Sequence, residues 1–381
     1  SAMFLSDSLL DSIHQRADYY DRSNEFPELD YQALKEAGYY KAFVPKEFGG
    51  HGLTLQEIAQ EQTRLAKAAP GTALGINMHQ IIVGLGRHLV AHGQAAGQQI
   101  LKDAAEGHLL AFGISEPSND RVLFGSICQA QPQSDGGYLF YGDKVFLSMI
   151  KACSRFVTFA TDSSQDQAQS VFAYAHKQDN QLEIHENWDT LGMRATQSHS
   201  VTLKGLQVSP EQILAKLAPG PSLDPTVFGI FAYFEILLAA TYLGIGQRAL
   251  ELGLETVKKR YSVSNQTTYD QDKNIRWRLA EAAIQLDAIP PQLNHFCQAL
   301  DQGHPYDLSW LPRLSALKNR SVEASKIAVE EVIRACGGQA YFSQNELSRL
   351  YRDVLAGLFQ PSDQESLHEA WANMLLGPIK S

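Results

Sequence analysis

The sequence predicts an α+β protein of three parts: an N-terminal α-helical domain, a middle small β-barrel and a C-terminal four-helix bundle. Two changes of pattern carry this prediction. Helical spacing of apolar residues extends to about residue 111, short β-rich runs follow as far as 218, and helical spacing returns from 219 onward. A chain of 381 residues also exceeds the length that one hydrophobic core usually serves. We therefore expect domains at 3–111, 112–218 and 219–381.

The first domain is predicted to be helical throughout. Apolar residues recur every three or four positions in Ser8–Tyr20, Ala33–Ala37 and Leu55–Ala69. Ala73–Ala91 is apolar on almost every side, which is typical of a helix that is buried between its neighbours.

The middle domain shows short runs of β-forming residues. These runs are Tyr138–Tyr141, Lys144–Leu147, Phe156–Ala160, Val171–Ala175, Leu182–His185 and Ser200–Leu206. Turn signals separate them, at Ser134–Gly137, Gly142–Asp143, Asp179–Asn180 and Gly205. Six short strands of this kind favour a small barrel or a sandwich.

The last domain follows a Pro- and Gly-rich segment at Pro219–Pro225. Its predicted helical segments are Ile236–Arg260, Gln271–Ala288, Leu311–Ala335 and Leu347–Leu358. Long helices in a bundle offer broad apolar faces, so we expect a homo-oligomer, either a dimer or a homotetramer.

Composition excludes several classes of partner. The net charge of −10 disfavours nucleic acid, and the absence of a run of 18 apolar residues disfavours a membrane span. The cysteines are widely separated, without the spacing of metal ligands, at Cys128, Cys153, Cys297 and Cys336. We expect a cytoplasmic protein with reduced, structural cysteines and no metal site.

Five short motifs follow one another along the chain. They are Ser115-Glu116-Pro117 upstream of Asp120, Lys144-Val145-Phe146-Leu147-Ser148, Gly192-Met193-Arg194-Ala195-Thr196, Gly244 with Gln247-Arg248 on a long helix, and Gly337-Gly338 followed by Arg352-Asp353. Together they resemble the signatures of the acyl-CoA dehydrogenase superfamily over nearly the whole chain. The resemblance implies a flavoprotein of fatty acid metabolism that oxidises the Cα–Cβ bond of an acyl-CoA thioester and passes a hydride to flavin N5.

The resemblance also implies the residues that hold the FAD. They are Ile114, Ser115, Phe146, Ser148, Arg260, Ser262, Gln271, Gly337, Gly338 and Ser362. In the family, the segment after the long helix reaches the FAD of a neighbouring subunit. Asp120 and Arg194 are the candidates for substrate binding. Simpler interpretations stay open, because Ser115 also fits a turn before Pro117 and Arg260 also fits the negative end of a helix dipole.

The usual catalytic base of the family is missing. Gln360 occupies its position, and a neutral amide cannot accept the α-proton of the substrate. Glu235, on the long helix, is a candidate for a displaced base, although it lies one position from the place where some family members carry theirs. That offset turns a side chain by about 100° around the helix axis. Asp363 and Glu365 are further candidates.

Two alternatives follow from the missing base. The ending Phe359–Glu369 resembles a branch close to the two-component flavin-dependent monooxygenases, in which FMN and histidine or serine residues serve the chemistry. His199 and His368 are the histidines to consider there. The other alternative is an inactive family member. The electron partner is expected to be an electron-transferring flavoprotein, oxygen or a flavin reductase.

Overall fold

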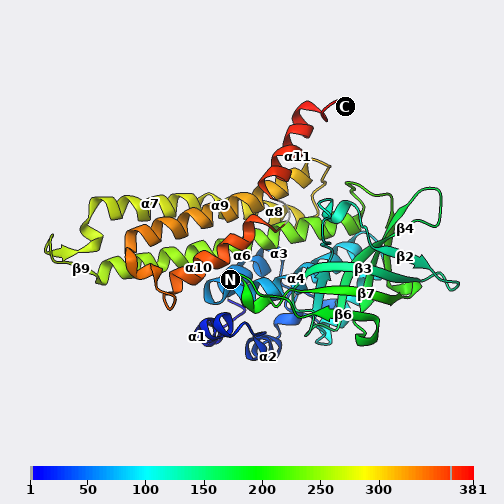
Figure 1. Ribbon diagram of the computed structural model, residues 1–381, viewed down its shortest axis with the longest axis horizontal. Coiled ribbons are helices and arrows are strands. Elements are labelled where there is room, and N and C mark those ends of the chain that lie inside the picture. The colour runs from blue at the N-terminus through cyan, green and yellow to red at the C-terminus, as the bar shows by residue number, and fades with distance from the viewer. Residues whose placement is uncertain (1–2, 361–362) are drawn as a thin grey trace.

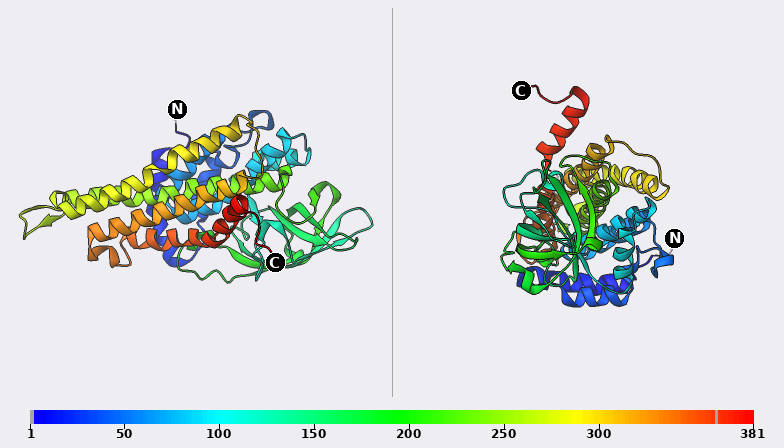
Figure 2. Two further views of the ribbon diagram at one scale, coloured as in Figure 1. Left: turned by 90° about the horizontal axis from the view of Figure 1, so that it is seen from above. Right: turned by 90° about the vertical axis from the view of Figure 1, so that its right-hand side faces the viewer.

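The computed structural model describes residues 3–360 and 363–381. Long helices run side by side along most of the molecule, the β-sheet lies beyond one end of them, and α1 and α2 flank one side (Figure 1). The right-hand view in Figure 2 shows that the last helix, α11, projects away from this body.

The N-terminal part is helical, as predicted. Its helices are α1 (Asp7–Ser23), α2 (Glu28–Glu36), α3 (Leu55–Ala68), α4 (Pro70–Ala91) and α5 (Ala96–Ala105). Thr54 begins α3 with a capping box. Its hydroxyl oxygen accepts from the backbone N–H of Glu57, and the Glu57 carboxylate accepts from the backbone N–H of Thr54. Almost every residue of α4 is buried, which agrees with its apolar composition.

The middle part is one sheet. Its strands are β1 (Leu110–Gly113), β2 (Gln129–Pro132), β3 (Tyr138–Leu147), β4 (Arg155–Asp162), β5 (Gln169–His176), β6 (Leu182–His185), β7 (His199–Val208) and β8 (Ile213–Leu217). They pair in the order β6-β7-β3-β2-β4-β5-β8, and β1 pairs with β4. The prediction of a closed barrel is not confirmed, because the two end strands of this order, β6 and β8, are not paired with each other within the described residues.

The boundary between two predicted strands was wrong. Gly142 and Asp143 continue β3 instead of forming a turn, and both pair with β7. Gly142 has a φ of +136° and lies so close to Cys128 that a Cβ atom there would be 2.6 Å from Sγ. Glycine is required at position 142 because a side chain would collide with Cys128 and because its φ is unusual within a strand. In the sequence alone, such a glycine looks the same as a glycine in a turn.

The C-terminal part is a set of long helices with a small hairpin. Its elements are α6 (Pro225–Lys259), β9 (Tyr261–Ser262), β10 (Thr267–Thr268), α7 (Lys273–Asp287), α8 (Ile289–Asp301), α9 (Trp310–Cys336), α10 (Glu346–Leu355) and α11 (Gln364–Leu376). Short 3₁₀ helices occupy several connections, at Tyr39–Lys41, Lys46–Phe48, Val122–Phe124, Asp179–Gln181, Arg194–Thr196, Pro210–Gln212, Tyr269–Gln271, Gly338–Tyr341 and Ala356–Leu358.

Helix α6 is the central element of the molecule. It begins at Pro225, directly after the N-cap Asp224, whose carboxylate accepts from the backbone N–H of Thr226. In the described chain it is the one helix long and apolar enough to span a membrane, but 94% of its apolar window is buried against the rest of the protein. Gly244 lets it approach α3, because a Cβ atom there would lie 2.4 Å from the carbonyl oxygen of Thr63.

Candidate active site

A cavity of about 850 Å³ lies where the sheet meets the helices. Its walls come from β1 and the loop after it, from β3, from the first turns of α6 and α9, and from one face of α11. The volume lies in the range of sites for drug-sized ligands and cofactors. Of the residues predicted from the sequence, it brings together Ile114, Ser115, Asp120, Phe146, Glu235 and Asp363.

Aromatic rings form much of the cavity wall. The Phe112 and Phe234 ring centroids lie 5.4 Å apart, and the Phe124 and Phe231 rings stack at 6.3 Å with an interplanar angle of 18°. Each pair joins a residue of the β region to one of α6. These separations are typical of favourable ring pairs. Because the four rings line the cavity, this part of its wall is apolar and suits a flat ligand.

The position of β1 in this wall depends on a buried histidine of α4. Nδ1 of His79 accepts from the backbone N–H of Leu110 at 3.0 Å, and its Nε2 lies 2.7 Å from the carbonyl oxygen of Tyr40. These partners fix the tautomer with the proton on Nε2. Burial lowers the pKa of His79 to about 4, so the ring stays neutral and holds the start of the β region against the helices.

Glu235 is the buried carboxylate that α6 contributes to the cavity. It is 2% exposed, and its Oε2 atom has no hydrogen-bond partner within the described residues. Burial raises the pKa of Glu235 to about 8, and the positive charge of Lys318 opposes that rise. A buried acid with a free oxygen and a pKa near neutrality is equipped to exchange a proton with a ligand in the cavity.

Gln360, at the position of the usual base, is held by the helices. The hydroxyl of Tyr242 donates to its Oε1 at 2.6 Å. Nζ of the buried Lys318 donates to the carbonyl oxygens of Gly357, at 2.7 Å, and Gln360. The Gln360 amide oxygen is therefore already engaged by Tyr242, and Gln360 is not among the residues that form the cavity wall.

A buried ion pair joins Glu116, which lines the cavity, to Lys144. Nζ of Lys144 is 2.6 Å from Oε2 of Glu116, and both side chains are 0% exposed. Lys144 also donates to the carbonyl oxygen of Phe159, while Ser126 and the N–H of Ile127 donate to Glu116. Despite burial, the charge of Lys144 and these bonds lower the pKa of Glu116 to about 2. This pair was not predicted from the sequence, although Glu116 and Lys144 both lie in its motifs.

The remaining cofactor candidates of the β region differ in accessibility. Phe146 is 62% exposed with a φ of +60°, and its ring meets that of Trp188 edge to face at 6.2 Å. Ser115 accepts from the N–H of Val145 through its carbonyl oxygen, which ties the two motifs together. Ser148 is buried, and its hydroxyl lies 2.6 Å from that of Ser198, outside the cavity wall.

Arg194 belongs to a different neighbourhood from Asp120. Nε of Arg194 donates to the carbonyl oxygen of Asp21 at 2.6 Å, and Nη1 donates to that of Thr190 at 2.8 Å. Asp120 is exposed and lines the cavity. The two predicted substrate-binding residues are thus not brought together within this chain.

The Arg352-Asp353 motif also makes contacts with the β region and α1. Arg352 pairs with Asp21 at 2.8 Å, and the carboxylate of Asp353 accepts from the N–H of Met193 at 2.7 Å. Gly192 is required nearby, because a Cβ atom there would be 2.4 Å from the Arg352 carbonyl oxygen. These contacts give the motif a structural role.

The other candidates for cofactor binding lie at the far end of α6. The set consists of Arg260, Ser262, Gln271, Gly337 and Gly338. Figure 1 shows β9 at the end of the bundle opposite the sheet. At 1.5 Å per residue, the helix places Arg260 about 38 Å along its axis from Glu235. No residue of this set can therefore contact the cavity of its own chain.

Arg260 has several partners at that far end. It donates to the carbonyl oxygen of Cys336 and lies over the ring of Tyr269 at 4.7 Å from the centroid. Gly337, which has a φ of +79°, ends α9 beside it, while no heavy atom lies within 4 Å of a Cβ atom built at Gly338.

The alternative acids and histidines are spread over α11 and β7. Asp363 lines the cavity and caps α11, with its carboxylate accepting from the N–H of Ser366 at 2.8 Å. Glu365 and His368 are exposed on α11 away from the cavity wall, and His199 is buried in β7, where burial lowers its pKa. Ser362 lies outside the described residues.

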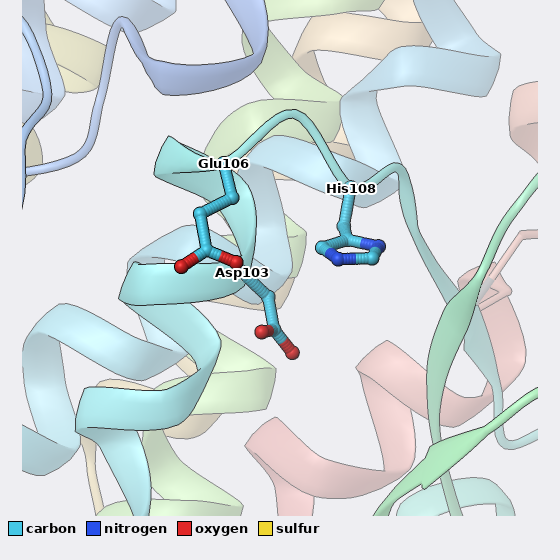
Figure 3. Close-up of side chains that lie close together, drawn as sticks. All are labelled: Asp103, Glu106 and His108. Carbon is cyan, nitrogen blue, oxygen red and sulfur yellow. The ribbon is translucent and has the colours of Figure 1, made fainter.

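One cluster has the residue types of a metal site. Asp103, Glu106 and His108 lie close together at the end of α5 (Figure 3). The carboxylate of Asp103 already accepts from the hydroxyl of Tyr174 at 2.7 Å and pairs with Arg155 at 3.3 Å. Nδ1 of His108 lies 2.8 Å from the Ser154 hydroxyl. Asp103 and His108 are therefore already engaged by protein groups.

Family models match both helical parts of the chain. The model described as "Acyl-CoA dehydrogenase, N-terminal domain" matches residues 6–108, and the one described as "Acyl-CoA dehydrogenase, C-terminal domain" matches 236–359. The chain belongs to the acyl-CoA dehydrogenase family. This confirms the resemblance and the arrangement of helical, β and helical parts.

Individual relatives of this family member carry more than one activity. A putative acyl-CoA dehydrogenase, YdbM of Bacillus subtilis, is 27% identical over 95% of this chain and 93% of its own. The L-evernosamine nitrososynthase of a Micromonospora strain is also 27% identical, over 89% and 81%. A structure of KijD3 in complex with FMN and a dTDP-linked sugar superposes with a TM-score of 0.86, at 22% identity, over 98% and 92% of the chains. The expected flavin agrees with that complex.

Proposed function

We propose that this protein is a flavin-dependent oxidoreductase that oxidises the Cα–Cβ bond of an acyl thioester, with Glu235 as the proton acceptor. The observation that carries the proposal is the cavity-facing carboxylate of Glu235, which is buried, has one oxygen without a partner and has a pKa raised to about 8. It supplies a proton acceptor where Gln360 cannot, in the wall of a cavity large enough for a cofactor ring and a small substrate.

The residues around the cavity fit a flavin ring. The wall is aromatic, Ile114 and Ser115 line it, and the lining residue Phe146 is exposed. These residues are our candidates for contacts with the ring. A bound flavin supplies the acceptor for the two electrons of the hydride.

Glu235 takes part in the proton balance of the proposed step. The substrate loses its α-proton to the ionised carboxylate and its β-hydrogen as a hydride, so a C=C bond forms while Glu235 becomes a neutral acid. Lys318, whose charge favours the ionised form of Glu235, prepares the carboxylate for this role. The aromatic rings keep water away from the carbon that is deprotonated.

The residues at the far end of α6 are part of the same proposal only in an oligomer. Arg260 lies about 38 Å from Glu235 along the axis of α6, and Gln271 follows the hairpin beyond it. We therefore propose that Arg260 and Gln271 contact the cofactor of a second copy. The expected homotetramer or dimer, the cytoplasmic location and an electron-transferring flavoprotein as redox partner belong to this proposal.

A second candidate function is a flavin-dependent monooxygenase that uses FMN. Two observations favour it: Gln360 replaces the usual base, and the nitrososynthase relative is as similar as the putative dehydrogenase. In that reaction Glu235 would serve as a proton donor, because its raised pKa keeps it protonated at pH 7.

The test is anaerobic reduction of the flavin-loaded protein by a panel of acyl thioesters. We expect at least one ester to bleach the flavin, and Glu235→Gln to slow that bleaching by about 10²–10⁴-fold. Glu365→Gln, which changes an exposed glutamate outside the cavity wall, is the matched control and should leave the rate unchanged. Reduction by no ester, together with substrate-dependent oxygen consumption when reduced FMN is supplied, would replace this function with the monooxygenase.

A further inference from the structure

A second, smaller cavity lies where the three parts of the chain meet. Its lining comes from α1, from the first turn of α4, from the Arg194–Thr196 turn and from α10. Its volume is about 10 Å³, close to the least space that holds one water molecule. It shares no lining residue with the cavity that contains Glu235, so the two cavities are separate.

The side chain of Arg349, on α10, brings unused hydrogen-bond donors to this cavity. It is 5% exposed, and neither its Nε nor its Nη1 atom has a hydrogen-bond partner within the described residues. Its Nη2 atom lies 3.7 Å from Glu346, a carboxylate that already accepts from Arg248 and contacts His14. Buried donors in folded proteins almost always have an acceptor, so these two indicate a ligand in the cavity.

The first turn of α4 and Arg194 add positive potential to the same cavity. Gly71 and Thr72 line it, the N-cap residue Ala69 makes no side-chain cap, and the first turn contains no acid. Because α4 has 22 residues, its N-terminus carries the partial positive charge of a full helix dipole. Arg194 pairs with Asp189 only at 3.6 Å, and the Asp189 side chain is 95% exposed, so solvent screens that pair.

Two carboxylates also line the cavity, but they do not cancel this positive potential. Asp21 is paired at 2.8 Å with Arg352, which lies outside the lining. Burial raises the pKa of Asp353 to about 6 and the charge of Arg349 opposes that rise, so Asp353 offsets Arg349 electrostatically. The charge of Arg194 and the N-terminus of α4 remain, and the balance of the cavity is positive.

We propose that this cavity binds one monoatomic anion, chloride, between Arg349 and the N-terminus of α4. Charge-assisted N–H bonds and a helix N-terminus both favour an anion over a neutral molecule. The small volume excludes phosphate, carboxylic acids and other larger anions. The inference does not depend on the proposed function, because the cavity is separate from the one that contains Glu235.

The bound ion has a structural role at the junction of the three parts. It lies between α10, which carries the Arg352-Asp353 motif, and the first turn of α4. An ion that binds the folded chain and not the unfolded chain stabilises the folded state by mass action. We therefore expect chloride to stabilise the protein.

The first test uses the unmodified protein and bromide, which replaces chloride and can be located by anomalous X-ray scattering. Crystals soaked in sodium bromide should show an anomalous peak in the cavity, within hydrogen-bond distance of Nε and Nη1 of Arg349. A water molecule at that place, with no bromide peak in the cavity, overturns the inference.

The second test is urea unfolding in solution while chloride replaces gluconate, an anion too large for the cavity, at constant ionic strength. From about 1 to 300 mM chloride, the folding equilibrium constant of the unmodified protein should rise about 10-fold. Arg349→Met should remove this dependence on chloride. Arg87→Met is the matched control and should keep it, because Arg87 donates to the carbonyl oxygens of Phe43 and Leu53 and does not line the cavity.

The outcomes of the second test also decide the inference. Stability of the unmodified protein that does not change with chloride overturns it, and so does an equal chloride dependence in Arg349→Met. If Arg349→Met does not fold, the bromide crystals and the chloride dependence of the unmodified protein decide the question by themselves.

Discussion

The two ends of helix α6 differ in how much their side chains are constrained. At the sheet end Glu235 is buried, has an oxygen without a described partner and has a pKa raised to about 8. At the opposite end Arg260 is half-buried and has a carbonyl and a ring as partners. A side chain that exchanges protons needs a buried environment such as that of Glu235. A side chain that recognises another molecule needs an accessible environment such as that of Arg260.

This difference teaches that the motif residues of the chain form two sites, and not one. The resemblance assigns Arg260 to the FAD of a neighbouring subunit, and within this chain Arg260 lies about 38 Å from Glu235 along the axis of α6. Exposed apolar side chains occur near the far end, where Tyr341 is 94% exposed and Val263 is 84% exposed.

The largest expected effect is at the sheet end. Replacing Glu116 by Gln leaves the buried Lys144 without its counter-ion, so the free energy of unfolding should fall by about 3–5 kcal/mol. Because the pKa of Glu116 is depressed to about 2, its contribution is present above pH 4.5 and is lost as pH falls toward 2. Urea unfolding at pH 7 and pH 3 measures both. Glu183→Gln, in an exposed pair with Lys204, is the control and should change stability by less than about 1 kcal/mol.

An intermediate effect is expected at the far end. Arg260→Ala should weaken flavin binding by about 10- to 100-fold if the residue contacts the cofactor of a second copy, since bonds to charged groups contribute roughly 1.5–3 kcal/mol. Flavin content and oligomeric state are measured together, with Lys259→Ala as the neighbouring control. Unchanged flavin binding in an intact oligomer would restrict Arg260 to packing against Tyr269 and Cys336.

The smallest expected effect separates two adjacent glycines. Gly337→Ala should destabilise the protein by about 1–3 kcal/mol, because its φ of +79° with a ψ of −163° is almost confined to glycine. Gly338→Ala should change stability by less than about 0.5 kcal/mol, because nothing lies within 4 Å of the added Cβ atom. If instead Gly338→Ala lowers flavin affinity without lowering stability, that glycine approaches the cofactor of another copy.

The sequence predicted the arrangement of elements well but not the contacts of the site. Long periodic segments such as Leu55–Ala69 and Ile236–Arg260 correspond to α3 and α6, because their apolar faces are repeated over many turns. The short strands β1, β2 and β8 were missed, since four or five residues give too little alternation. Glu235 was predicted as a displaced base, and the structure adds its burial and its free oxygen.

Contacts between distant segments could not be predicted from one sequence. The aromatic wall joins Phe112 to Phe234, and the Glu116–Lys144 pair joins two different motifs. Both depend on how the sheet packs against α6, which no local pattern encodes. The open edge of the sheet is a second example, because six strand-like runs are equally compatible with a closed barrel.

The most direct test of the central claim is the pH dependence of anaerobic flavin reduction by an acyl thioester that bleaches the flavin. If Glu235 accepts the α-proton, the rate constant rises about tenfold per pH unit below 8 and levels off above it, because only the ionised carboxylate is active. Glu235→Gln should abolish this profile. A rate that falls above pH 8, or a profile that survives Glu235→Gln, would contradict the assignment of Glu235 as the base.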